Sequence, residues 1–179
     1  NAVRRLTEML PRMNALLTAA RERGSIIIHA PSDCMPAYET HAARMRVSQI
    51  PISKLPDNIA SWCSRIPAEE NQFNGYPIDQ SDGGEDDDPQ EHRTWSHQLE
   101  SLGRNPNMPW KAQSPAIDID AEQDYISDRG DEVWSILQHR KIQHVLMVGV
   151  HTNMCVLGRP FGLRQMVQQK MDVALVRDL

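Results

Sequence analysis

The chain has 179 residues, of which 40% are hydrophobic and 24% are charged, and its formal net charge at pH 7 is -5. This length is typical of one domain whose core needs no disulfide or metal ion to hold it together. The acidic balance argues against a nucleic-acid partner, because phosphate binding requires a basic face. The apolar runs are far shorter than the ~20 residues of a membrane span, so no membrane partner is expected either.

Three cysteines, Cys34, Cys63 and Cys155, are spread at irregular spacing. An odd number without a CxxC pair predicts neither a full disulfide framework nor a zinc site. We therefore expect a reducing, cytoplasmic compartment. The chain reads as truncated at both ends, so a secretory leader ahead of Asn1 stays an open alternative.

The N-terminal part predicts a helix followed by a strand. Apolar residues recur at intervals of three and four from Val3 to Ala20, which indicates an amphipathic helix that ends at Gly24 and can kink at Pro11. Residues 25–30 are β-branched on both faces, as in a strand that is covered on two sides.

Residues 31–115 differ from the rest of the chain in composition and in hydrophobic pattern. They contain ten of the 12 prolines and little regular periodicity, which predicts a long irregular insertion that builds a lid or a binding surface. An acidic run at residues 82–88 lacks the spacing of a calcium-binding EF-hand, so a solvated loop is expected there.

The C-terminal part predicts alternating strands and helices. Strands are expected at 116–119, 144–148 and 173–176, with one helix over 128–140 and another after Cys155. Such alternation is typical of parallel βαβ units. We therefore predict an α/β fold in which residues 1–179 form a single domain.

Cys155 is the candidate nucleophile. The strand at 144–148 breaks at Gly149 and brings Cys155 to the start of the next helical pattern. A thiolate at this place is stabilised by backbone N–H groups and the helix dipole, and amides of the tight turn could also bind an oxyanion. The alternative is that Cys155 is a small buried hydrophobic residue, as most free cysteines are.

The segment Gly149–Val156 resembles the strand-end signature of the isochorismatase-like cysteine hydrolases, which include nicotinamidases. This resemblance implies a three-layer α/β/α fold with a mainly parallel sheet, here without its first strand. It also implies an acyl-enzyme on Cys155 and a cis peptide bond at Val150–His151. The amides of His151 and Cys155 would then be the oxyanion donors, and a homo-oligomer is expected by analogy.

Two members of the Cys–Asp–Lys triad of that family have no counterpart here. The aspartate belongs to a strand that precedes the first helix, and the lysine would fall near residues 122–124, which read Glu-Gln-Asp. Arg129 is close in sequence but stays protonated, so it cannot act as a base. The chain therefore either uses a variant triad or binds its ligand without turnover.

Three further residues near the cysteine are candidates. His151 could act as a base or orient the substrate, although we favour a role for its backbone alone. Asn153 could hydrogen-bond a ligand or simply suit a tight turn. Arg159 could hold a substrate carboxylate, with a solvated arginine or a subunit contact as the alternatives.

No metal and no cofactor are expected. His29, Asp33 and His41 fall where nicotinamidase-like relatives can carry a metal, but their spacing differs from the tight pattern of those proteins. GxGxxG and GxxxxGK[ST] motifs for nucleotide phosphates are also missing from the sequence. The sequence predicts a hydrolase of a small amide or related C–N bond, with a small-molecule substrate. The alternatives are a non-catalytic binding or scaffold protein and an isochorismatase-type vinyl ether hydrolase.

Overall fold

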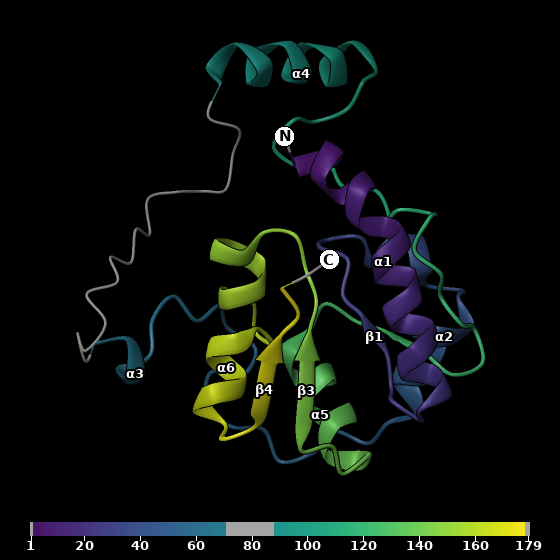
Figure 1. Cartoon of the computed structure of the whole chain (residues 1–179), viewed down its shortest axis with the longest axis vertical. Helices are drawn as coiled ribbons and strands as arrows, with labels where there is room; N and C mark the ends of the chain where they lie inside the picture. The colour runs from purple at the N-terminus through teal and green to yellow at the C-terminus, as the bar shows by residue number, and fades with distance from the viewer. Residues whose placement is uncertain (1, 71–87, 178–179) are drawn as a thin grey trace.

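The computed structural model describes residues 2–70 and 88–177, and its helices and strands follow one another as in Figure 1. The longer helices are α1 (Ala2–Glu22), α4 (Pro89–Ser101), α5 (Gly130–His139) and α6 (Leu163–Gln168). Short helical segments are η1 (Met35–Tyr38), α2 (Ala42–Met45), η2 (Arg46–Gln49), α3 (Pro67–Glu70) and η3 (Thr152–Val156). The strands are β1 (Ile28–His29), β2 (Tyr125–Ile126), β3 (His144–Met147) and β4 (Asp172–Leu175).

The strands form two short parallel sheets. β1 pairs with β2, with Ile28 opposite Tyr125, and β3 pairs with β4, with His144 opposite Asp172. The α/β class is therefore confirmed. The predicted single sheet is not seen in the described part of the chain, because β1 and β2 are only two residues long and no strand pairs with the free edges of β1 and β3.

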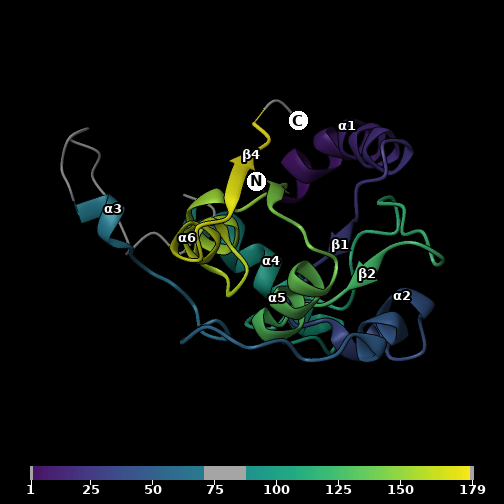
Figure 2. The same cartoon turned by 90° about the horizontal axis from the view of Figure 1, so that it is seen from below.

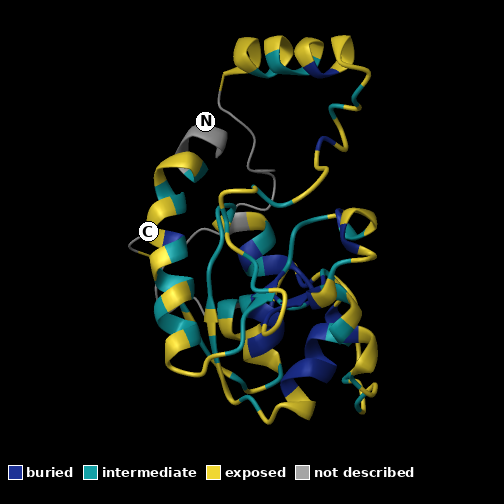
Figure 3. Ribbon diagram, turned by 90° about the vertical axis from the view of Figure 1, so that its right-hand side faces the viewer, coloured by how far each residue is buried: buried dark blue, intermediate teal, exposed yellow. Residues whose placement is uncertain are grey.

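Helix α5 joins the two sheets into one core. Its apolar side packs Ile136 with Ile28 of β1, and packs Val133 and Leu137 with Val145 of β3. Figure 2 shows α5 on one side of the strands and α1 on the other. In Figure 3 the buried residues gather around this core, whereas α4 at the top is largely exposed.

The predicted strand at 116–119 is wrong. These residues form a turn, and their backbone polar groups bind side chains instead of a neighbouring strand. Asn14 of α1 donates from Nδ2 to Ala116 O at 2.6 Å, and its Oδ1 accepts from Asp118 N–H at 3.0 Å. One apolar residue of this stretch, Ile119, still packs against the core cluster that contains Tyr38. The alternating pattern therefore reflects the packing of Ile119 against the core. The strand in this part of the chain is β2.

The segment 31–115 is as irregular as predicted where it is described, apart from its short helices and the 13-residue α4. Most of the acidic run lies outside the described residues, but Asp88 is described and caps α4, because its carboxylate accepts from Gln90 N–H at 2.8 Å. None of the described helices combines the length and the apolar character that a membrane span requires.

Candidate functional site

The turn after β3 positions Cys155. It continues into η3, a π-helical segment in which Val156 N–H donates to His151 O at 3.1 Å and Leu157 N–H donates to Thr152 O. Neither bond uses the amide of Cys155, which lies in the first turn of the segment. Gly149 packs closely here, because a Cβ atom on it would lie 2.4 Å from Val156 Cγ2 and would force that side chain to move.

The predicted cis peptide at Val150–His151 is wrong. All peptide bonds within the described residues are trans. The π-helical turn lets the chain reverse between β3 and α6 without a cis bond, at a place where such wide turns often accompany function. The proposed oxyanion role of the Cys155 amide is therefore independent of a cis bond.

The sulfur of Cys155 is partly buried among polar side chains. The side chains of His151 and Arg159 lie close enough to influence its ionisation, and Ser32 Oγ lies 4.0 Å away. His151 has the largest effect and lowers the pKa of the Cys155 thiol. Burial acts in the opposite direction, and Arg159 and Ser32 add to the lowering. The thiolate is therefore favoured over an ordinary cysteine.

A cavity of about 430 Å³ lies beside this turn. Its walls include residues that follow the carboxyl ends of three strands: Asp33 after β1, Asp128 after β2 and Arg159 after β3. Cys155 itself is not part of the wall. Arg159 contacts both the sulfur and the cavity, so this residue links the two.

The arginine at this link is nearly enclosed. The side chain of Arg159 is 8% exposed, and its guanidinium carbon lies 5.2 Å from the centre of the Trp62 ring. Its Nη2 atom is 3.7 Å from Asp33 Oδ2, and its buried Nε atom has no hydrogen-bond partner within the described chain. The charge of Arg159 is thus only loosely neutralised.

Gly130 allows the cavity wall to close. A Cβ atom on this residue would lie 2.0 Å from Ile59 O and 2.5 Å from Pro160 Cβ. The first turn of α5 can therefore approach the 58–62 segment and the turn after η3 only because residue 130 is glycine. The side chain of Asn153, the remaining predicted binding residue, lies outside what the structure describes.

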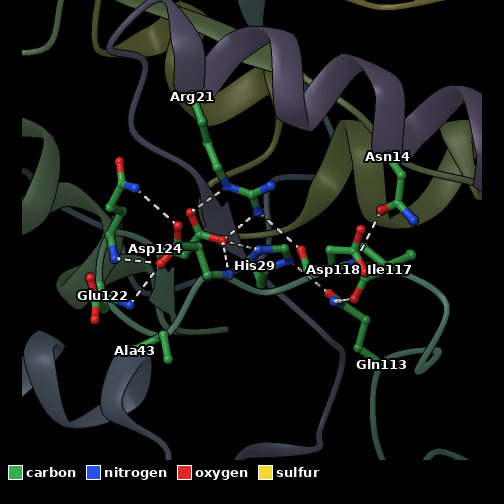
Figure 4. Close-up of polar contacts among 12 residues, drawn as sticks. Asn14, Arg21, His29, Ala43, Gln113, Ile117, Asp118, Glu122 and Asp124 are labelled. Atoms are coloured by element: carbon green, nitrogen blue, oxygen red, sulfur yellow. Dashed lines mark hydrogen bonds and ion pairs between the residues drawn. The ribbon is translucent and has the colours of Figure 1, made fainter.

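A second polar cluster lies beneath α1 and is closed (Figure 4). His29 Nε2 lies 2.9 Å from Asp124 Oδ2 and His29 Nδ1 lies 3.1 Å from Gln113 Oε1. Arg21 donates two hydrogen bonds to the same carboxylate, at 2.5 and 3.0 Å. Burial disfavours ionisation of Asp124, but the bonds from His29, Arg21 and Asp120 N–H outweigh it and lower its pKa to about 2.

The residues considered for a metal site are engaged elsewhere. The ring of His29 belongs to the closed cluster, and His41 Nδ1 accepts from Ala43 N–H at the start of α2. Asp33 lies at the cavity, with its backbone N–H donating to Asp128 Oδ2. Within residues 2–70 and 88–177, no three His, Cys, Asp or Glu side chains come together as a metal site would require.

The chain matches no protein-family model, no curated protein and no solved structure with which it was compared. The isochorismatase-like resemblance of Gly149–Val156 therefore stays a prediction.

Sequence reasoning missed three contributors to this site. The side chain of His151 contacts the sulfur, whereas only a backbone role was favoured. Asp128 and Trp62 line the cavity without having been considered. One signal was available for Asp128: it closely follows a buried strand, and the carboxyl ends of parallel strands are where sites form. That strand, β2, is too short to produce a recognisable pattern.

Proposed function

We propose that this chain is a cysteine hydrolase that cleaves a small amide or a related C–N bond, with Cys155 as the nucleophile. The observation that carries this proposal is that His151 and Arg159 both lower the pKa of the Cys155 thiol, while Arg159 also lines the adjoining cavity and Ser32 Oγ lies 4.0 Å from the sulfur. An activated thiol, a proton carrier and a space for substrate are thereby brought together.

In the proposed reaction the Cys155 thiolate attacks the amide carbonyl carbon. The oxygen becomes an oxyanion, to which the amide of Cys155 can donate. The C–N bond then breaks as protonated His151 gives its proton to the leaving amine, and a thioester remains on Cys155. Water next transfers a proton to His151 and attacks the thioester, which releases a carboxylic acid and restores the thiolate.

His151 would thus take the proton-transfer role that the isochorismatase-like family gives to its aspartate and lysine. Its position supports this, because it lies at the start of the same turn and lowers the pKa of the Cys155 thiol. We also propose that the two sheets and their flanking helices are parts of that family's three-layer arrangement. The homo-oligomer, the cytoplasmic location and the vinyl ether alternative stay predictions.

Iodoacetamide labelling followed by peptide mass spectrometry tests the activated thiol. We expect Cys155 to be alkylated with a midpoint well below the ~8.5 of a free cysteine, whereas buried Cys34 and Cys63 react slowly in the folded protein. Ammonia release from primary amides should stop in Cys155→Ala, with an unchanged circular dichroism spectrum. An ordinary midpoint for Cys155, or release that survives Cys155→Ala, would contradict the proposal and favour the binding protein.

A further inference from the structure

The cavity beside Cys155 carries charges of both signs. Arg129 is already paired, because its Nη2 lies 2.6 Å from Asp131 Oδ2. The charges that remain for a ligand are the positive charge of Arg159 and the negative charges of Asp33 and Asp128.

The guanidinium group of Arg159 can bind an anion. Its distance of 3.7 Å from Asp33 is longer than a hydrogen bond, and its Nε–H is buried without an acceptor in the described chain. A guanidinium that turns towards a ligand carboxylate would gain charge-assisted bonds in the paired geometry that arginine favours. The side chain is already placed for this, because it lines the cavity.

A carboxylate alone would be poorly accommodated, because Asp33 and Asp128 stand at the same cavity. Asp33 N–H donates to Asp128 Oδ2 at 3.1 Å, which holds the two residues next to each other. The side chain of Asp33 is 62% exposed, and its pair with Arg159 is a loose one. A cationic group on the ligand would neutralise these carboxylates when the ligand's own carboxylate competes for the arginine.

We infer that the cavity binds the zwitterionic head of a small amino-acid-like amide, with its carboxylate on Arg159 and its ammonium group beside Asp33 and Asp128. Trp62, whose ring already stacks on Arg159, provides an apolar surface for the carbon chain. The inference rests on the proposed function for one point, namely that the amide end of the ligand is directed towards Cys155.

Binding to the Cys155→Ala variant tests this site without any turnover. The probes are L-asparagine and L-glutamine, each with two analogues: succinamate and glutaramate lack the ammonium group, while β-alaninamide and γ-aminobutyramide lack the carboxylate. We expect titration calorimetry or ligand-observed NMR to show at least one zwitterion binding about tenfold or more tightly than both of its analogues. Equal binding of all three members of each set, or no binding of either zwitterion, would overturn the inference.

Two substitutions on the Cys155→Ala background assign the groups. Arg159→Gln should abolish the preference over the analogue that lacks a carboxylate, and Asp33→Asn should reduce the preference over the analogue that lacks an ammonium group. Asp33 is exposed and has a φ of 54°, which asparagine tolerates, so its variant should fold. The exposed Asp172→Asn is the matched control and should change neither preference. Preferences that survive both cavity variants would overturn the inference.

The outcome is separable from that of the proposed function. Selective binding together with an unreactive Cys155 would leave the zwitterion site in place and remove the hydrolase. An activated Cys155 with no selectivity would leave the hydrolase and remove the zwitterion site.

Discussion

Two clusters in this fold contain the same three side-chain types, an arginine, a histidine and an aspartate, yet they are built differently. In the cluster beneath α1, Asp124 is 1% exposed and receives hydrogen bonds at 2.5 to 3.0 Å from Arg21 and His29. In the cluster at Cys155, the arginine and the aspartate are 3.7 Å apart and the aspartate is 62% exposed.

The difference shows which cluster is structural and which is available for a ligand. A closed network of buried charges stabilises one arrangement and leaves no group for another molecule. A loosely paired arginine beside a cavity and a partly buried thiol keeps its interactions for a partner. Substitutions in the first cluster should therefore change stability, and those in the second should change reactivity.

The largest effect is expected for Asp124→Ala. Its removal leaves the charge of Arg21 without its buried partner, which costs about 3–5 kcal/mol of unfolding free energy. Urea denaturation followed by circular dichroism measures this loss. The exposed Asp33→Asn is the matched control and should stay within about 0.5 kcal/mol of the unchanged protein. Comparable losses in both variants would break the distinction between the clusters.

The second-largest effect is expected from acid, which should lower the free energy of unfolding by protonating Asp124. The pKa of Asp124 falls from 3.8 to about 2 on folding, so its ionisation contributes roughly 2 kcal/mol of stability. This contribution is complete above the unfolded value of 3.8 and is lost as the pH falls through the folded value of about 2. Denaturant titrations over this range should show the loss, and Asp124→Asn should flatten it. An equal acid dependence in Asp124→Asn would contradict the assignment to this carboxylate.

The smallest effect concerns His151, whose bond to the sulfur lowers the pKa of Cys155. His151→Gln should move the alkylation midpoint of Cys155 to higher pH and slow its reaction at pH 7 by up to about tenfold, because less thiolate is present. Unfolding free energy should change little. His144→Gln is the control, since His144 is exposed and pairs with Asp172 on the surface. Equal rates in the two variants would show that His151 does not activate the thiol.

The fold from α5 to β4 could largely be predicted from the sequence, because the helix and strands there have strong patterns. The helix expected at 128–140 is α5 at Gly130–His139, and the strand expected at 144–148 is β3 at His144–Met147. The last strand was placed one residue too late. In the first strand only residues 28–29 of the expected 25–30 pair, because β2 offers a partner of just two residues.

Two other failures arise from tertiary geometry that no local sequence pattern shows. The side chain of Asn14 forms hydrogen bonds with the backbone of Ala116 and Asp118. No local sequence pattern predicts this contact, because Asn14 belongs to a helix that is distant in sequence. Likewise, Cys155 was found from its place after a strand, but its bond to His151 depends on the π-helical geometry of the turn. Sequence spacing alone predicts an ordinary helix start there.

That geometry also makes the number of residues in the turn a constraint of its own. His151 and Cys155 meet because η3 closes through its wide hydrogen bond from Val156 to His151. Deleting or inserting one residue between them would rotate the sulfur around the segment and carry it away from the imidazole. Engineering of this protein should therefore keep the length of the turn unchanged.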